Sequence, residues 1–382
     1  MRLGLLPALG GSIASLRASG QDSRLIDGYL RPYARAFGGV TYFSYAPEAL
    51  ADYTDDPAVR AAVELRAPRR STPRLWRALS LPAVERAAFR RCSVLRSFQV
   101  TGVIPALIAR GLWGIPFVTS YGFWYARLSR PGPPRAAKRL LERLGLRRAA
   151  AVIVPTPELR DHVVRVAGSA DRVHLIPNGV DAARFAPVGA PGDAARPAAA
   201  GPGRILYVGR LEPEKNLPTL LAAAARVGAR RPVRVELVGT GSLEPALRAE
   251  AAALGVSADF AGVVDHRRLP ERLRAAQAFV LPSFTEGHPK VLIEAMAAGL
   301  PCVASDCPGN RALVEDGATG LLFDPRQPDA LAACLDRVLG DPALAAALGR
   351  RARERAVREY DLDALVQREI ALLRSVARAA GR

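Results

Sequence analysis

Short apolar runs alternate with longer amphipathic stretches along almost the whole chain. The short runs are rich in Val, Ile, Leu, Phe and Tyr, which is typical of buried strands. They are residues 2–9, 39–45, 92–100, 115–121, 150–156, 172–177, 204–209, 234–239, 258–263, 278–283, 301–306 and 319–323. Between them lie helical repeats such as 217–230 and 243–255. Near-continuous apolar strands separated by helices predict an α/β fold with parallel sheets covered on both faces.

One stretch interrupts this alternation. Residues 188–203 ("VGAPGDAARPAAAGPG") hold Gly, Pro and Ala but few large apolar side chains, as in a linker or a surface excursion. A chain of 382 residues also exceeds one ordinary core. We therefore predict two Rossmann-like, doubly wound domains that face a central cleft. Their expected bounds are 1–185 and 204–360, joined by 186–203 and followed by a C-terminal segment, 361–382.

The positive charge is concentrated in the first half. The net charge is +18, and residues 1–198 hold 29 basic and 14 acidic residues against 25 and 22 in 199–382. Within 60–148 the count is 19 against 3. This excess indicates either a surface that faces an anionic partner or a solvated Arg-rich surface. Nucleic acid is not the expected partner, because no known binding module is evident.

Residues 135–149 ("RAAKRLLERLGLRRA") combine basic residues with leucines at helical spacing, at positions 140, 141 and 144. A basic amphipathic helix can lie on an anionic membrane, so peripheral membrane contact is one prediction. The alternative is an ordinary helix that packs its leucines on the core.

Cysteines and the N-terminus indicate a cytoplasmic chain. The four cysteines form no CxxC pair, which argues against a zinc site or a disulfide framework. The start, "MRLGLLPALGG", fits a first strand and turn better than a signal peptide. The longest uncharged run, 111–126, is too short for a transmembrane helix.

The segment 205–221 ("ILYVGRLEPEKNLPTLL") places cations at the end of a predicted strand. Gly209 makes the turn, and Arg210 and Lys215 precede a helix. Ligands of parallel sheets bind at this end, where a cation pair suits a diphosphate. The alternative is a solvated loop in which Glu212 and Glu214 pair with the cations. In the next unit, "VGTGSLE", a lone GxG predicts a close backbone approach, either to a nucleotide or to the sheet.

Residues 286–301 ("EGHPKVLIEAMAAGLP") carry two carboxylates in an apolar context. Pro289 is a favoured first helical residue, and the helix after it is apolar nearly all round, which indicates burial. Glu294 therefore needs a partner, either vicinal ribose hydroxyls or an ion pair such as one with Arg311. Glu286 lies in the preceding loop, and the amides of 287–291 can hold a phosphate. Lys290 either adds to the positive potential of these amides or faces solvent.

These motifs together resemble the family 4 retaining glycosyltransferases of the GT-B fold. The resemblance rests on "VGR" with its later Lys, Glu286 and Glu294 eight residues apart, "IPNGVD" (176–181) and "DGATGLLF" (316–323). It implies that a hexose-type sugar passes from a nucleotide diphosphate sugar to a glycan or lipid-linked acceptor of the cell envelope. It also implies a last helix, 361–382, that crosses back to the first domain. The only Asp-x-Asp motif is 361–363, so we expect no metal and no cofactor.

The resemblance assigns roles residue by residue. Arg210 and Lys215 would bind the diphosphate and stabilise the departing nucleotide, Glu286 would contact the donor sugar, and Glu294 would hold the ribose. The remaining expected donor-binding residues are Gly209, Gly287, His288, Pro289, Lys290, Val291, Gly10 and Gly11. For His288, a donor contact is expected rather than a place in the core.

Two positions depart from the family pattern. Tyr121 precedes Gly122 where the family often has His, and Ala312 stands where a Glu is usual. Two rival functions also remain open: a sugar-nucleotide epimerase of similar architecture, and a catalytically silent scaffold that binds nucleotide sugars.

Overall fold

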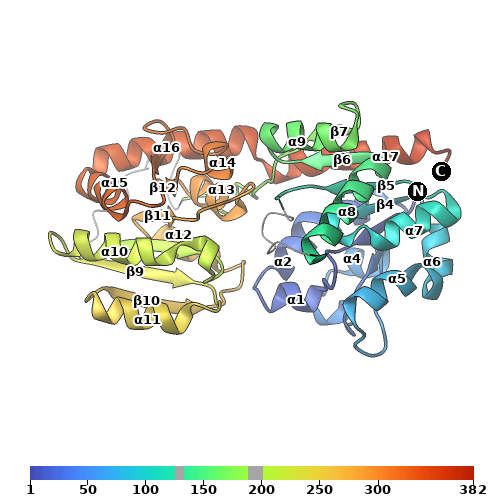
Figure 1. Ribbon diagram of the computed structural model, residues 1–382, viewed down its shortest axis with the longest axis horizontal. Coiled ribbons are helices and arrows are strands. Elements are labelled where there is room, and N and C mark those ends of the chain that lie inside the picture. Colours follow the sequence, from blue (N-terminus) through green and yellow to red (C-terminus); the bar gives the residue numbers. More distant parts are fainter. Residues whose placement is uncertain (125–132, 188–200) are drawn as a thin grey trace. The chain divides into compact units, whose positions relative to one another are not determined.

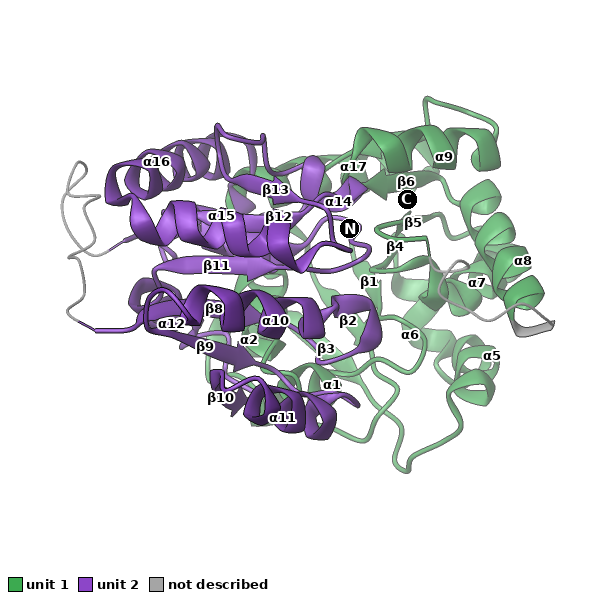
Figure 2. Ribbon diagram, turned by 60° about the vertical axis from the view of Figure 1, so that its left-hand side comes forward, with its two compact units in different colours: residues 1–177, 363–382 green, residues 178–362 purple. Residues whose placement is uncertain are grey.

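The computed structural model describes residues 1–124, 133–187 and 201–382 (Figure 1). The chain divides into two compact units (Figure 2): unit 1 comprises 1–177 and 363–382, and unit 2 comprises 178–362. The division therefore falls at Pro177 and Asn178, whereas the sequence predicted a first domain that ends at 185 and a linker at 186–203. Most of that predicted linker, 188–200, lies outside the described residues.

Unit 1 contains a seven-stranded parallel sheet in the order β3-β2-β1-β4-β5-β6-β7. Its strands are β1 (Leu3–Leu6), β2 (Val40–Phe43), β3 (Val63–Arg66), β4 (Val94–Ser97), β5 (Phe117–Ser120), β6 (Ala151–Val154) and β7 (Val173–Leu175). Strand β3 was not predicted. It is an edge strand whose last three residues are only half-buried, and Glu64 and Arg66 interrupt the apolar signal on which the prediction rested.

Helices cover this sheet on both faces. They are α1 (Ile13–Arg17), α2 (Asp22–Leu25), α3 (Arg31–Ala36), α4 (Pro57–Ala62), α5 (Arg74–Val84), α6 (Arg86–Arg91), α7 (Ile104–Trp113), α8 (Pro133–Arg148), α9 (Pro157–Ala167) and α17 (Leu362–Ala379), with the π-helix η1 (Ile26–Leu30) and the 3-10 helices η2 (Leu50–Asp52) and η3 (Val100–Gly102). The chain moves across the sheet in one direction from β1 to β3 and in the opposite direction from β3 to β7. Because crossovers between parallel strands are right-handed, these two groups of connections lie on opposite faces of the sheet. Accordingly α5, α7, α8 and α9 pack in sequence on one face (Figure 1).

Unit 2 contains a six-stranded parallel sheet in the order β10-β9-β8-β11-β12-β13. Its strands are β8 (Gly203–Val208), β9 (Val233–Val238), β10 (Ser257–Gly262), β11 (Ala278–Leu281), β12 (Cys302–Ser305) and β13 (Leu321–Phe323). Its helices are η4 (Pro213–Lys215), α10 (Leu217–Gly228), α11 (Glu244–Ala253), α12 (Leu269–Ala275), α13 (Lys290–Ala297), α14 (Pro308–Arg311), α15 (Pro328–Gly340) and α16 (Pro342–Glu359). The prediction of two doubly wound α/β domains is confirmed at the level of fold class.

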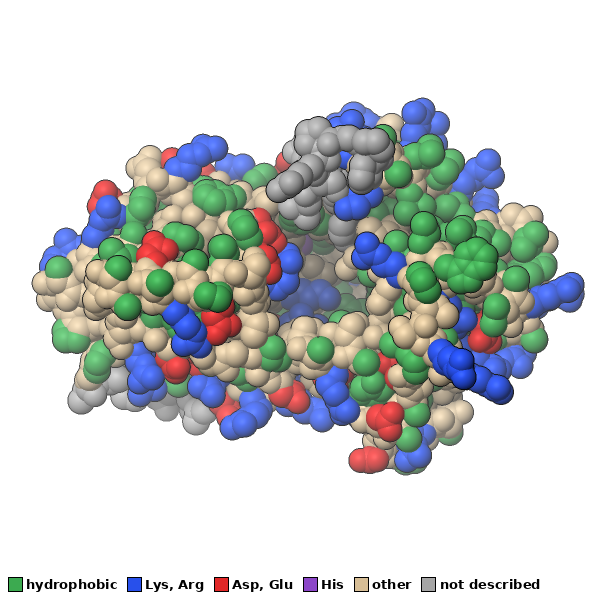
Figure 3. Space-filling model, turned by 60° about the horizontal axis from the view of Figure 1, so that its bottom comes forward, with side chains coloured by type: hydrophobic (Ala, Val, Ile, Leu, Met, Phe, Trp, Pro, Cys, Tyr) green, Lys and Arg blue, Asp and Glu red, His purple; other side chains and the backbone are tan. Residues whose placement is uncertain are grey.

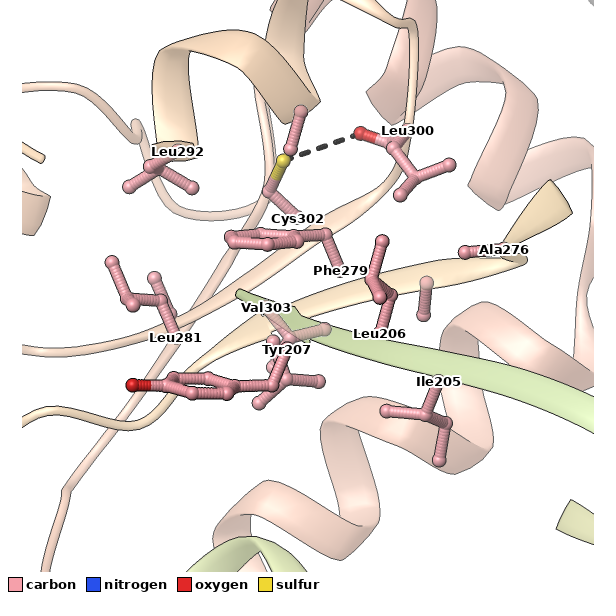
Figure 4. Packing of buried hydrophobic residues seen from close by; sticks show 14 of the residues in the cluster. Ile205, Leu206, Tyr207, Ala276, Phe279, Leu281, Leu292, Leu300, Cys302 and Val303 are labelled. Carbon is pink, nitrogen blue, oxygen red and sulfur yellow. Dashed lines mark hydrogen bonds between the residues drawn. The ribbon is translucent and has the colours of Figure 1, made fainter. Parts of the chain in front are cut away.

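The core of unit 2 lies where its central strands meet the buried helices. Figure 4 shows Leu206, Phe279 and Val303 of β8, β11 and β12 packed together, with Leu292 of α13 nearby. The Cys302 thiol donates to the Leu300 carbonyl at 3.3 Å, so this cysteine is part of the core. Because α13 is buried against this core, its N-terminus is fixed beside the exit of β11. Among the described residues, no helix is long and apolar enough to cross a membrane.

Candidate active site

The loop after β8 is shaped by Gly209. A Cβ atom at this position would lie 2.5 Å from the hydroxyl oxygen of Tyr207, and the Tyr207 hydroxyl donates to the Arg210 carbonyl at 2.8 Å. A side chain at 209 would therefore break the contact that holds Arg210 in place. Asn216, in the left-handed region with φ 54°, ends the loop and donates to the carbonyls of Pro282 and Pro325 at 3.1 and 2.7 Å. The ends of β8, β11 and β13 are thereby tied together.

The two predicted phosphate-binding cations differ in their surroundings. The Arg210 side chain is 66% exposed and pairs with Glu214 at 2.6 Å, as the solvated-loop alternative expected. Lys215 is largely buried, and its ammonium donates to Glu286 Oε1 at 2.6 Å. Glu212 pairs with neither, because it accepts from the backbone and hydroxyl of Ser242. Lys215 and Glu286, 71 residues apart in the chain, thus form one buried pair.

Glu286 is held from two sides. Its Oε1 also accepts from the Ser283 hydroxyl at 2.7 Å. Behind it, α14 presses on the loop: a Cβ atom on Gly309 would lie 2.5 Å from the backbone of Glu286 and 2.7 Å from the Gly287 carbonyl. Burial raises the pKa of the Tyr207 hydroxyl well above its usual range, and the Glu286 carboxylate raises it further. The carboxylate is therefore oriented by the loop, by Ser283 and by Lys215.

Helix α13 begins directly after this loop. The helix begins at Lys290, one residue later than predicted, because Pro289 is its N-cap residue, and Lys290 and Val291 lie in the first turn. The first backbone amides of a helix have no acceptors within the helix and carry partial positive charge. The first turn of α13 therefore directs N–H groups toward the region next to Gly287.

Glu294 is almost completely buried and its Oε1 lies 2.8 Å from His266 Nε2. The predicted alternative partner, Arg311, is wrong, because Arg311 pairs with Asp306 at 3.1 Å. The ring of His266 in turn packs on Phe185, with ring centroids 5.4 Å apart. Sequence reasoning missed His266, which follows β10 and carries no spacing signal toward α13.

His288 lies in the protein interior. Burial, aided by Lys290 and Arg355, lowers its pKa to about 3, so its imidazole is neutral near pH 7. Its ring packs edge-to-face on Tyr360, with centroids 5.5 Å apart. Asn178, from "IPNGVD", donates to the His288 carbonyl at 2.7 Å. The imidazole is thus placed as the core alternative expected, while its backbone ties the loop to Asn178.

The two glycines of the GxG at 239–241 allow their loop to pack closely on the loop after β8. A Cβ atom on Gly239 would lie 2.0 Å from the Gly209 carbonyl oxygen, and one on Gly241 would lie 2.3 Å from that of Leu211. Leu211 N donates to Thr240 O at 2.9 Å, which joins the two loops. Both glycines are therefore required by contact with the loop after β8, a reason that neither sequence alternative named.

In unit 1, Gly10 and Gly11 follow β1 and lead into α1. Gly10 has φ 84°, which favours glycine, and Gly11 donates to the Ala8 carbonyl at 2.7 Å. The Ser12 side chain caps α1, and the amides of Ile13 and Ala14 donate to the Glu48 carboxylate at 3.1 and 2.7 Å. The loop is thus a tight turn ahead of a helix N-terminus that a carboxylate occupies.

Tyr121, at the family's usual His position, belongs to a polar cluster of unit 1. Its hydroxyl donates to Glu142 Oε1 at 2.5 Å and lies 3.3 Å from His162 Nε2, and the two rings stack. With Trp124 and two arginines of α8, these residues line a cavity of about 350 Å³.

The charged groups of this site in unit 2 suit a ligand that carries both a phosphate and several hydroxyl groups. A buried ammonium, a helix N-terminus and an exposed guanidinium favour phosphate, while two oriented carboxylates favour hydroxyl groups. All of these lie in the loops that leave β8 and β11 or on α13, where parallel sheets bind ligands.

Two family models and several known proteins match this chain. Residues 193–355 match the family of glycosyl transferases group 1, and residues 12–179 match the glycosyl transferase 4-like domain. D-inositol 3-phosphate glycosyltransferase of Frankia alni is 35% identical over 67% of this chain and 68% of its own length. Glycogen synthase of Mycobacterium tuberculosis is 36% identical over 56% of this chain, which spans only 52% of that protein.

Solved structures support the same fold. Sucrose-phosphate synthase from Thermosynechococcus elongatus has a TM-score of 0.82 and 25% identity and covers 99% of this chain and 100% of its own. HepE from Anabaena, in complex with UDP, has a TM-score of 0.76 and 21% identity over 98% of this chain and 100% of its own.

The fold and these matches define a glycosyltransferase. The chain belongs to the group 1 glycosyltransferases of the GT-B fold, the family 4 type that the sequence motifs resembled.

Proposed function

We propose that this protein is a retaining hexosyltransferase that uses a nucleotide diphosphate sugar and acts in the cytoplasm on a glycan or lipid-linked acceptor of the cell envelope. The observation that carries the proposal is the buried Lys215–Glu286 pair beside the N-terminus of α13. A buried cation next to helix amides suits a diphosphate, and an oriented carboxylate suits the hydroxyl groups of a sugar.

In this proposal each residue of the cluster has a separate task. Lys215 turns from Glu286 toward the departing diphosphate, and the exposed Arg210 exchanges Glu214 for a phosphate oxygen. The amides of 287–291 complete the phosphate site, and Glu294, oriented by His266, accepts from the ribose hydroxyls. Glu286 contacts the donor sugar near its reacting carbon. Cations placed in advance stabilise the leaving group without reorganisation.

The bond changes follow from that placement. The anomeric carbon–oxygen bond to the diphosphate breaks as the acceptor hydroxyl attacks from the same face. The leaving phosphate oxygen takes the proton of that hydroxyl, and configuration is retained because the attack comes from the face that the leaving group occupied. We propose that no metal is required, because the Lys215 and Arg210 charges and the helix amides supply the positive charge that a metal ion would otherwise provide.

A thermal-shift panel of UDP, GDP, ADP, CMP and dTDP, each with and without EDTA, tests the donor site. A ligand at 100 times its Kd adds about 2.7 kcal/mol to the free energy of unfolding. We expect one nucleotide to raise the Tm by several degrees and EDTA to leave that shift unchanged. Loss of the shift with EDTA would contradict the metal-free site, and the absence of a shift with all five nucleotides would contradict the proposed diphosphate site.

Transfer itself is tested with the matching nucleotide sugar and an acceptor. The expected product is an acceptor that has gained one hexose in mass and whose new anomeric proton has the configuration of the donor, measured by mass spectrometry and NMR. Conversion of the donor without an acceptor would instead identify an epimerase. An inverted product would refute retention.

A further inference from the structure

Three neighbouring helices of unit 1 expose apolar side chains on one layer. Helix α5 packs on α7, and α7 packs on α8, so the three lie side by side over the same face of the sheet (Figure 1). One of them, α8, carries the basic amphipathic segment found in the sequence, whereas α5 and α7 gave no such signal. The three helices are called the basic layer below.

Helix α5 has two faces of opposite kind. Its inner face buries Ala78 and Leu81 in unit 1. Its outer face presents Leu75, Trp76 and Leu79, which are 54%, 67% and 50% exposed. These three residues lie one helical turn apart or less, so they form a continuous apolar stripe. A large exposed apolar stripe of this kind marks an interaction site more often than scattered single residues do.

The other two helices extend this exposure. Leu112 near the end of α7 is 62% exposed, and Leu140 and Leu144 of α8 are 59% and 43% exposed. Leu140 and Leu144 are four residues apart and thus share one face of the helix. The alternative for this segment, that its leucines pack on the core, therefore fails for these two. Leu141, by contrast, packs against the core.

Arginines border the stripe and have no carboxylate partners. In the described ranges, no ion pair forms at Arg69, Arg70, Arg74, Arg86 or Arg90, and all five are exposed. The acidic residues of 60–148 already have partners: Glu64 pairs with Arg2, Arg66 and Arg91, Glu85 lies 3.9 Å from Arg66 and from Arg77, and Glu142 of α8 is buried and accepts from Tyr121. The outer surface is thus apolar in its centre and positively charged at its border. Figure 3 shows hydrophobic and basic side chains gathered over unit 1, with few acidic ones among them.

We infer that the basic layer of unit 1 docks on an anionic lipid bilayer, with Trp76 and its leucine neighbours in the headgroup region and the arginines against the lipid phosphates. Trp is favoured at this boundary because its ring is apolar and its N–H is polar. Each basic residue near an anionic surface strengthens binding, and apolar side chains add the hydrophobic term. The inference concerns unit 1 alone and needs no catalytic turnover.

Two other occupants fit the surface less well. A second copy of the chain would bring two arginine-rich faces together in a two-fold contact, with like charges opposed. A nucleic acid would satisfy the arginines but would leave the leucines of three helices in water. A bilayer surface satisfies both at once.

Co-sedimentation of the full chain with lipid vesicles tests the inference. We expect binding to phosphatidylcholine vesicles that contain about one-third phosphatidylglycerol, and little binding to pure phosphatidylcholine. Raising the salt from about 0.1 M to about 1 M shortens the screening length from about 10 Å to about 3 Å and should weaken binding at least about tenfold. Lipids brominated at shallow depth should quench tryptophan fluorescence in the wild type but much less in Trp76→Ser.

Matched variants separate this surface from general charge and hydrophobicity. Trp76→Ser with Leu79→Ser should lower the partition coefficient by about 100-fold, because two large apolar side chains no longer leave water. Arg69→Glu with Arg70→Glu should lower it at least about 20-fold. The controls lie on α16 of unit 2: Val357→Ser replaces another exposed apolar residue, and Arg350→Glu with Arg351→Glu makes the same change in charge. Both controls should bind as the wild type does.

Three results would overturn the inference: no binding to anionic vesicles at low salt, equal loss in the unit 2 controls, or full binding by the Trp76 and Leu79 double variant. A Trp76-dependent dimer in sedimentation velocity, without vesicle binding, would assign the surface to a second copy instead. Circular dichroism and thermal melting of every variant show whether its fold is kept. None of these outcomes depends on whether the donor site transfers sugar.

Discussion

An ion pair between distant parts of the chain lies in the interior of each unit, and these two pairs differ in how completely they are enclosed. In unit 1, Arg96 of β4 donates to Glu369 of α17 at 2.5 Å, and both side chains are almost fully buried. In unit 2, Lys215 donates to Glu286 at 2.6 Å, and the two side chains are 16% and 10% exposed. The pairs are similar in length but not in surroundings.

The unit 1 pair has several further hydrogen-bond partners. Arg96 also donates to the Ser97 carbonyl and to the Ser120 hydroxyl, and Glu369 also accepts from the Tyr33 hydroxyl at 2.5 Å. Burial opposes the charge of Arg96, but Glu369 outweighs it, and the pKa of Arg96 is raised. Such a pair fixes α17 on the sheet.

The unit 2 pair keeps capacity for a ligand. Within the described residues, the only acceptor of the Lys215 ammonium is Glu286, although an ammonium can donate three hydrogen bonds. The pair also lies where loops meet a helix N-terminus. The comparison teaches that additional protein partners and fuller burial, rather than the N···O distance, separate a structural ion pair from one that can exchange a partner for substrate.

The largest expected effect is on the stability of unit 1. Replacing Glu369 by Ala leaves Arg96 buried without its counterion, which costs about 3–5 kcal/mol. Chemical denaturation should show this loss in the unfolding free energy. The matched change Glu286→Ala, at a site closer to solvent, should cost less than half as much, and equal losses would refute the contrast between the two pairs.

The next effect is on catalysis. Glu286→Gln keeps the shape of the side chain but removes its charge, and we expect the rate of sugar transfer to fall about 10²–10³-fold. Binding of the free nucleoside diphosphate should stay equal or tighten, because Lys215 is released from its carboxylate. Calorimetry and single-turnover rates measure the two separately. Unchanged transfer would remove Glu286 from the reaction.

A pH effect on stability should follow from His288. Its pKa is about 3 in the folded chain, against an ordinary value of 6.5, so folding favours the neutral ring. This contribution is complete above about pH 6.5 and decreases as the pH falls toward 3. At pH 5 the loss amounts to about 2 kcal/mol. The variant His288→Phe should have a flatter stability curve between pH 7 and 5, whereas a slope equal to that of the wild type would contradict the buried neutral ring.

The smallest expected effect concerns His266. Removing this donor to Glu294 by His266→Ala should weaken nucleotide binding about tenfold, or about 1.4 kcal/mol, because the carboxylate loses its orientation. His266→Gln can still donate and should restore most of the affinity. Equal affinities for all three proteins, measured by calorimetry, would mean that Glu294 does not hold the ribose.

The sequence predicted most strands, because a strand buried on both faces is a continuous apolar run that can be read locally. It missed β3, whose edge position allows charged residues. It singled out Lys215, Glu286 and Glu294 as candidate site residues, since each interrupts an apolar or loop pattern with a charge that needs a partner. It could not pair them: for the alternative in which Glu294 has a partner within the protein, the example was Arg311, and the observed partner is His266.

The same division holds for the surface. The basic character of residues 60–148 is a property of composition, and a count of charged residues along the chain is enough to find it. That α5, α7 and α8 lie next to one another depends on the order of strands in the sheet, which local periodicity does not encode.

By itself, then, the sequence determined the α/β class, the two-unit organisation and the family, because periodicity, composition and motif order are local features. Only the tertiary structure decided which charges meet, which glycines touch a neighbouring loop and which apolar residues stay exposed. These depend on contacts between residues up to hundreds of positions apart, as between Tyr33 and Glu369. Such contacts arise when separate strands and helices pack into one core, and no short window of sequence contains them.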